Sequence, residues 1–314
     1  MTAPRISTRL PRYRRAAGEV ALLLTNRDLD ILARVESQRL ASSEHLRHLI
    51  DGSDQQILRR LQKLYHAGYL DRVRPQPVNG GGSAPMVYAI TNRGVRALRE
   101  RARLEDPSHT DWNAQNRSLH DLSIRHQLLV SQVRAVMELA AAARSNLRLL
   151  FWKEGRNLYD AVEVALPEGY RRAPVAPDAY FALEDAKGRM NFFLEADRGT
   201  MTLKRFVMKL KAYAAYFEER RHQEKFGIRF FRVLTVTTSA THKRNLVSAA
   251  AAEDDVRALG RMFLFADDSV LSLSSPERVL GSIWTTAAGE DASLILGSDA
   301  ESRNNNLKTE VTKK

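Results

Sequence analysis

Residues 53–74 read SDQQILRRLQKLYHAGYLDRVR, and the fold predicted for the amino-terminal part of the chain depends on this segment. Ser53 followed three residues later by Gln56 is a capping-box pattern that starts a helix, and Gly68 ends it. After Gly68 the apolar residues change from helical spacing to alternation, which is typical of a strand. The predicted helix buries Ile57, Leu61, Leu64 and Tyr65. The stretch therefore predicts a helix followed directly by the first strand of a hairpin.

The sequence on either side completes a small domain. Thr25 and Asp28 form another capping-box pattern, which starts an earlier helix. Two alternating apolar segments flank a Pro- and Gly-rich stretch, a pattern that predicts a β-hairpin. The predicted elements are helices over 25–39, 43–49 and 53–67, strands over 69–73 and 86–90, and a closing helix over 91–103. This order is that of a winged helix-turn-helix DNA-binding domain, which we place at residues 20–104, after a flexible basic arm over residues 1–19.

The outward face of the predicted 53–67 helix carries side chains suited to DNA. Arginine can bind guanine and glutamine can bind adenine in the major groove, while lysine meets phosphates. No acidic residue lies between Gln55 and His66, although exposed helices ordinarily mix acids and bases. The hairpin would add phosphate contacts. The predicted DNA-binding residues are Gln55, Gln56, Arg59, Arg60, Lys63, Arg72, Arg74, Gly81 and Ser83. An ordinary solvated basic surface is the alternative interpretation.

The positive charge of the chain is concentrated in this region. The formal net charge of the 314 residues is +12. Residues 1–104 hold 19 Lys and Arg against 9 Asp and Glu, a net charge of +10, which leaves +2 for the rest. Such a concentration favours a polyanion partner, because each neutralised phosphate releases counterions, although a basic surface can also serve solubility alone.

Composition excludes several classes of protein. The chain has no cysteine, which excludes disulfides, thiolate zinc sites and a cysteine nucleophile and favours a reducing, cytoplasmic location. No apolar run is long enough to span a membrane.

The rest of the chain has the pattern of an α/β domain with a mixed sheet. We place a linker at 105–117, where turn formers and charges lack periodicity, the domain at 118–288, and a disordered tail at 289–314. The predicted helices lie at 118–144, 202–218 and 242–252, and the predicted strands at 147–154, 179–183, 191–197, 232–237 and 262–265. The whole chain is therefore predicted to be α+β.

Three carboxylates in this domain form a candidate catalytic cluster. Glu195 and Asp197 are two residues apart on a predicted strand, so their side chains leave the same face. Asp178 begins the preceding strand. Converging carboxylate oxygens would suit Mg²⁺ and phosphodiester hydrolysis, with Lys209 or Lys211 completing the site. In the alternative interpretation these carboxylates are structural and pair with nearby cations, and no cofactor is indicated.

Several segments resemble the replication-relaxation family of plasmid and integrative-element proteins. They are residues 25–32, YLDRVR at 69–74, GGGSAPMVY at 80–88, TNRG at 91–94, LHDL at 119–122, FFLEADRGT at 192–200, KLKAY at 209–213 and VLTVTT at 233–238. The EADRGT block is the distinctive one. The resemblance implies a protein that binds double-stranded DNA in replication, relaxation or conjugative mobilisation of a mobile genetic element, with a relaxase or replication protein of a relaxosome as partner. It leaves a homodimer open.

The order of elements after residue 118 and the Pro-Asp…Glu-x-Asp series also resemble the PD-(D/E)-x-K nuclease fold. Asp197 stands where that fold has its lysine, so the resemblance implies a degenerate restriction-endonuclease-like domain. Three functions stay open at this point: an accessory DNA-binding protein, a Mg²⁺-dependent nickase, and a winged-helix transcriptional regulator.

Overall fold

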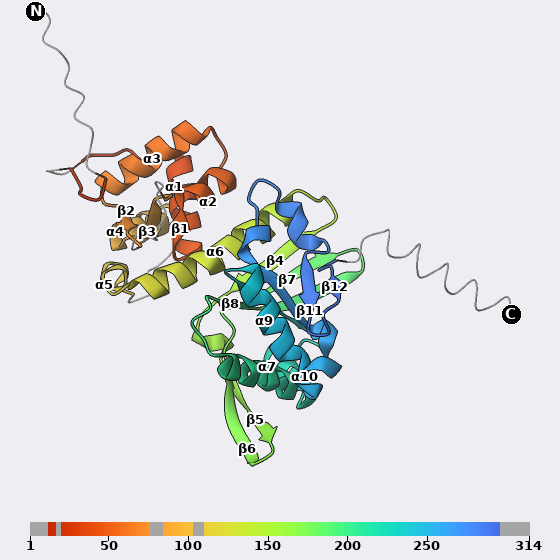
Figure 1. The fold of residues 1–314 in the computed structure, drawn as a ribbon. Helices are drawn as coiled ribbons and strands as arrows, with labels where there is room; N and C mark the ends of the chain where they lie inside the picture. The colour runs from red at the N-terminus through yellow and green to blue at the C-terminus, as the bar shows by residue number, and fades with distance from the viewer. Residues whose placement is uncertain (1–11, 17–19, 76–83, 103–109, 296–314) are drawn as a thin grey trace, which may run out of the picture. The chain divides into compact units, whose positions relative to one another are not determined.

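The computed structural model describes residues 12–16, 20–75, 84–102 and 110–295 (Figure 1). Its contacts divide the chain into two compact units, Met1–Gln132 and Val133–Lys314. The division falls inside helix α6 (Asp121–Ala142), and not in the linker expected at 105–117. The first half of α6 belongs to the first unit because Ile124 is buried there and the Ser131 hydroxyl donates to the Leu40 carbonyl oxygen at 2.7 Å.

The first unit is built from short helices around a small antiparallel sheet. Thr25, Ser42 and Ser53 each cap a helix by accepting a backbone N–H with the side-chain oxygen. The elements are α1 (Asn26–Ser37), β1 (Ala41–Ser42), α2 (Ser43–Leu49), α3 (Asp54–His66), β2 (Leu70–Val73), β3 (Val87–Ile90), α4 (Asn92–Ala102) and α5 (Trp112–Arg117). The sheet order is β1-β3-β2, with both pairs antiparallel.

The core of this unit joins all its main helices to the sheet. Ile57, Leu61 and Leu64 of α3 are fully buried, as the helical spacing predicts. They lie in one cluster with Ile31, Leu32 and Val35 of α1, Leu46 of α2, Leu70, Tyr88 and Ile90 of the sheet, and Val95 of α4. Burial of each such side chain contributes about 1.5–3 kcal/mol, so the core fixes which faces of α3 remain outside.

Part of the expected flexible arm is attached to this unit. The Arg15 guanidinium donates to the carbonyl oxygens of Tyr65 and Leu70, both at 3.1 Å, and to Asp71 at 2.5 Å. The Ala16 N–H donates to Nδ1 of His66 at 3.0 Å. These contacts correct the expectation of a flexible arm for residues 12–16, because they satisfy polar groups at the end of α3 and the start of β2. Residues 1–11 and 17–19 lie outside the described residues.

The second unit is a mixed seven-stranded sheet with helices. Its order is β12-β11-β10-β9-β8-β7-β4, in which β8, β9 and β10 are parallel and the remaining pairs antiparallel. The strands are β4 (Arg148–Lys153), β7 (Ala179–Asp185), β8 (Gly188–Asp197), β9 (Arg232–Thr237), β10 (Phe263–Asp267), β11 (Trp284–Thr286) and β12 (Asp291–Ala292). The helices after α6 are α7 (Leu203–Glu218), α8 (Arg221–Phe226), α9 (Ala240–Ala251) and α10 (Asp254–Ala258).

A separate hairpin, β5 (Asp160–Leu166) and β6 (Gly169–Val175), has no counterpart in the sequence prediction. Val162 and Val164 alternate with exposed Glu163, and their side chains join the core cluster that contains Phe206 and Leu210 of α7. Figure 1 shows this ribbon extending from the end of the unit where α7 lies. The hairpin forms because its period-two apolar face is covered by a helix rather than by the main sheet.

Part of the segment expected to be a disordered tail is ordered, and residues 296–314 lie outside the described residues. Residues 291–292 pair with β11, and Leu294 is fully buried. The described residues contain no helix with both the length and the hydropathy needed to cross a membrane.

Candidate functional site

One stripe of α3 faces solvent and carries the side chains expected to contact DNA. Gln55, Arg59 and Lys63 are spaced four residues apart, which places them on one line along the helix. All three are exposed. Among the residues that the structure describes, none forms a hydrogen bond or ion pair with the Arg59 or Lys63 side chain. This stripe therefore presents two cations and an amide that the fold itself does not use.

The neighbouring stripe of α3 faces α1 instead. Nε of Arg60 donates to Oδ1 of Asp28 at 2.6 Å, and its Nη2 donates to Oδ2, while Asp28 is fully buried. Burial alone would raise the pKa of Asp28, but the hydrogen bonds from Arg60 and Thr25 outweigh it and lower that pKa. The prediction that Arg60 contacts DNA is therefore corrected: its guanidinium holds a buried carboxylate between two helices.

Gln56 also belongs to this inner stripe. Its Oε1 accepts from Nη1 of Arg27 at 3.3 Å, and Nε of Arg27 donates to the carbonyl oxygen of Asp51 at 3.1 Å. The Gln56 side chain remains exposed. The expected capping box at Ser53 is only half formed, because the Gln56 amide turns toward Arg27 instead of the cap.

The two arginines of the hairpin differ in their surroundings. The Arg72 guanidinium lies 4.3 Å from the ring centroid of Tyr65 and donates to the carbonyl oxygen of Arg12 at 2.5 Å. The Arg72 guanidinium therefore binds the chain segment before α1, and this contact would have to break before Arg72 could bind a DNA phosphate. Arg74 is exposed and lies 5.3 Å from the Tyr13 ring. Gly81 and Ser83, predicted at the tip, lie outside the described residues.

In the second unit, Glu195 lies buried at the carboxyl end of β8 between two donors. Lys209 Nζ of α7 donates to one of its oxygens, and the Tyr213 hydroxyl donates to the other at 2.5 Å. Burial, supported by the nearby charge of Asp178, raises the pKa of Glu195 to about 7 although Lys209 acts in the opposite direction. This contact of Lys209 is compatible with both interpretations of the sequence, a catalytic group and a structural ion pair.

Asp197, two residues on, is satisfied in the same way. Its Oδ2 lies 2.6 Å from Nε2 of His242 on α9 and accepts from the Thr237 hydroxyl at 3.3 Å. Its Oδ1 accepts from the Gly199 N–H at 3.1 Å. The third predicted carboxylate, Asp178, accepts from the Ala196 N–H at 2.8 Å.

Asp267, a carboxylate that is not among the predicted site residues, lies beside Asp197 at the ends of the parallel strands, and we call this alignment the acidic row. Because β8, β9 and β10 are parallel and in register, Asp197, Thr237 and Asp267 are aligned side by side at the strand ends. Asp267 is buried, accepts from the Ser269 hydroxyl, and lies 3.7 Å from Lys243 Nζ. Its position after the apolar run Phe263–Ala266, at a parallel strand end, is the signal that would have indicated it.

The other predicted lysine lies elsewhere. Lys211 Nζ forms ion pairs with Glu253 at 2.7 Å and Asp255 at 3.5 Å, near the start of α10. It is two residues from Lys209 on the same helix, so the two side chains leave on different sides. The prediction that Lys211 completes the acidic site is therefore corrected.

The carboxylates do not have the arrangement that Mg²⁺ requires. Each oxygen of Glu195 and Asp197 already has a protein donor or a histidine nitrogen as partner. Within the described ranges there is no group of three acidic or histidine side chains placed to hold a metal ion. The acidic row is thus a set of internal pairs, Glu195 with Lys209, Asp197 with His242, and Asp267 with Lys243.

Comparison with known proteins places the chain in a family. A search of curated proteins finds no match. Among solved structures, the restriction endonuclease FokI aligns with a TM-score of 0.30 and 12% identity, covering 80% of this chain and 43% of that one. The chain thus spans less than half of that enzyme, and a superposition this loose supports no inference. The profile of the replication-relaxation family matches residues 32–230, which confirms the resemblance stated above, and the chain belongs to this family.

Proposed function

We propose that this protein binds double-stranded DNA through α3 of its first unit, acting as an accessory factor in the replication, relaxation or mobilisation of a plasmid or other mobile element. The observation that carries the proposal is the exposed stripe of Gln55, Arg59 and Lys63. The order α1-β1-α2-α3-β2-β3 supports it, because a winged helix-turn-helix has this order and uses its third helix in the major groove.

Each residue of the stripe has a distinct role in this proposal. Arg59 lies at the centre and can donate two hydrogen bonds to a guanine edge. Gln55, one turn earlier, can bind adenine in the same way, and Lys63, one turn later, can meet a phosphate. Arg74 beyond β2 offers a further phosphate contact. Arg60 and Arg72 are left out, since the fold already uses them.

Family membership supports the biological setting. A protein of this setting would work in the cytoplasm beside a relaxase or replication protein, either alone or as a homodimer. A winged-helix transcriptional regulator would use the same surface. Footprinting on the DNA of the host element separates the two, because an accessory factor protects an origin and a regulator protects a promoter.

The experiment that tests DNA binding compares two variants over a range of salt concentrations. Arg59→Ala combined with Lys63→Ala should weaken binding to the footprinted duplex and reduce the slope of log affinity against log salt. The matched control is Arg144→Ala, an exposed arginine after α6. Unchanged affinity and slope in the double variant would exclude this surface.

A second candidate function, a metal-dependent DNA nuclease using Asp178, Glu195 and Asp197, draws on one observation. Lys209 contacts Glu195, and Asp178 and Asp197 also help to raise the pKa of Lys209 against the opposing effect of burial. The donor set described above argues against a resident Mg²⁺. Incubating supercoiled plasmid with the protein and Mg²⁺ or Mn²⁺ tests this second function. Relaxed product that is absent with Glu195→Gln supports cleavage. Intact plasmid with both metals would exclude the nuclease and leave DNA binding as the proposed function.

A further inference from the structure

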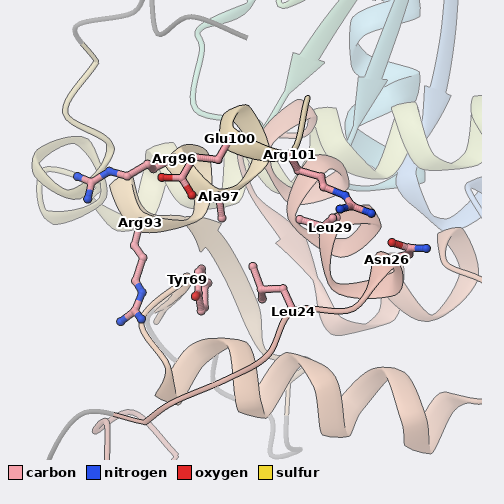
Figure 2. Close-up of a pocket in the computed structure, with 9 residues that line it drawn as sticks. All are labelled: Leu24, Asn26, Leu29, Tyr69, Arg93, Arg96, Ala97, Glu100 and Arg101. Atoms are coloured by element: carbon pink, nitrogen blue, oxygen red, sulfur yellow. The ribbon is translucent and has the colours of Figure 1, made fainter. Parts of the chain in front are cut away.

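The first unit contains a pocket that the proposed DNA surface does not use. It has a volume of about 540 Å³ and lies between the start of α1, the residue before β2 and one face of α4 (Figure 2). Its apolar lining consists of Leu24, Leu29, Tyr69 and Ala97, all half-buried. This size falls within the range of small-molecule sites.

The pocket exists because α4 is held close to the chain at Tyr69. Gly94 makes this approach possible: a Cβ there would lie 2.4 Å from the Tyr69 carbonyl oxygen. The Thr91 hydroxyl donates to the same oxygen at 2.9 Å and fixes the first turn of α4. The backbone contact is thus tight, and the side chains on either side of it enclose the pocket.

The rim of the pocket is cationic. Arg93, Arg96 and Arg101 line it, with Glu100 as the acid among its lining residues. Figure 2 shows Arg93 and Arg101 on either side of Tyr69 and Leu24 in this view. Arg96 and Arg101 are exposed, and no ion pair of either is found in the part of the chain that the structure describes.

The charges at the amino-terminal end of α4 are unfavourable for this helix. Helix α4 carries Arg93 in its first turn, with no acid there, although a helix amino terminus favours negative charge. Arg93 and Arg96 are like charges one turn apart, whereas Glu100 is an opposite charge one turn after Arg96. The Arg93 guanidinium lies 4.7 Å from the Tyr69 ring centroid, so an aromatic face and cations meet at one place. A bound anion would pair with the exposed Arg96 or Arg101, and a planar body would cover the apolar floor.

We propose that this pocket binds a phosphorylated ligand with a planar base, that is, a nucleotide, with the phosphate at the arginines of the rim and the base against the apolar floor. The nucleotide has two possible sources, a free nucleoside triphosphate or the 5′ end of a single DNA strand. Both present the same chemistry to the pocket. The proposal does not depend on duplex binding by α3, since the two surfaces share no residue.

Calorimetric titration of the full chain with three probes tests the proposal: ATP, inorganic phosphate and a 5′-phosphorylated single-stranded oligonucleotide. Arg96→Glu combined with Arg101→Glu should weaken nucleotide binding at least about tenfold for each lost charge-assisted contact. Ala97→Trp fills the pocket without changing charge and should abolish ATP binding while leaving phosphate binding at the rim. The charge-matched control, Arg59→Glu with Lys63→Glu on α3, should lose duplex DNA and keep the nucleotide.

The outcomes are distinct. ATP binding that both pocket variants reduce assigns the site to a free nucleotide, and binding of the oligonucleotide alone with the same dependence assigns it to a strand end. Nucleotide binding that is absent, or that survives both pocket variants, overturns the inference whatever the result with duplex DNA. Circular dichroism of each variant confirms that the fold is retained.

Discussion

The charged side chains on the exposed stripe of α3 and those in the acidic row at the ends of β8, β9 and β10 differ in burial and in whether they pair within the protein. Arg59 and Lys63 remain in water, and the described residues supply them with no internal partner. Glu195 and Asp197 are buried, and each contacts a basic side chain of a neighbouring helix. The first arrangement leaves electrostatic interactions for another molecule, whereas the second satisfies them within the fold.

The pair Asp28 and Arg60 shows that the contrast does not follow the boundary between the units. Arg60 is next to Arg59 on α3, yet its interaction resembles those of the acidic row. Its partner Asp28 is fully buried and accepts two hydrogen bonds from the Arg60 guanidinium. Neighbouring positions on one helix can therefore have opposite roles, because a helix turns by about 100° per residue. The following predictions test whether burial really separates structural charges from functional ones.

The largest effect is expected from breaking the pair of Glu195 and Lys209. Lys209→Met should destabilise the second unit by about 3–5 kcal/mol, because it leaves a carboxylate buried without its cation. Denaturant unfolding of the full chain measures this. Lys204→Met, at an exposed position of the same helix, is the control. Adding Glu195→Gln to Lys209→Met should recover part of the loss, and equal loss in both would contradict the assignment.

A smaller loss of stability is expected at the first unit. Arg60→Met should lower the free energy of unfolding by about 2–3 kcal/mol, since Asp28 would keep only its Thr25 donors. The adjacent substitution Arg59→Met should leave stability unchanged and weaken DNA binding by about 1–3 kcal/mol. If the two variants exchange these effects, the division of α3 into inner and outer stripes is wrong.

The two buried carboxylates should respond to pH in opposite directions. The pKa of Glu195 is raised from 4.5 to about 7, so its contribution to stability is fully present below pH 4.5 and is lost as pH rises through 7. The pKa of Asp28 is lowered from 3.8, so its contribution is present above that pH and is lost as pH falls through the folded value.

Hydrogen exchange, corrected for the intrinsic pH dependence of its rate, measures this difference. Protection of β8 and α7 should increase between pH 8 and pH 5, while α1 and α3 should keep theirs over that interval. Glu195→Gln should remove the pH dependence of β8 and α7. The interpretation fails if the wild type and this variant respond alike.

The smallest effect is expected from Lys63→Ala. A lysine that contacts a phosphate contributes almost equally to the affinity for every DNA sequence. The variant should therefore bind specific and nonspecific duplexes slightly more weakly, by the same factor for both. The salt slope should fall by about one unit. A selective loss on the specific site, measured by competition between duplexes, would mean that Lys63 reads a base.

Much of the fold follows from local sequence. Thr25 and Ser53 cap helices where their patterns predict, and the helix over Ser43–Leu49 and the strand over Arg232–Thr237 match the expected bounds. Side-chain capping and the spacing of apolar residues act within a few residues of one another, so a single sequence contains the information. The sequence does not predict the hairpin β5–β6, whose apolar face packs against α7, a helix some forty residues later. It does not predict strand β12 either, which pairs with the nearby β11.

The candidate sites divide in the same way. The acid-free polar face of α3 and the common side of the strand from which Glu195 and Asp197 leave are both predictable from local sequence, because they depend only on helix and strand periodicity. The pairing of Arg60 with Asp28, the contact of Lys209 rather than Lys211 with Glu195, and the alignment of Asp267 with Asp197 depend instead on the packing of the whole chain. These are contacts between segments far apart in the chain, fixed by the packing of the core and the register of parallel strands, and no periodicity in one segment encodes its partner in another.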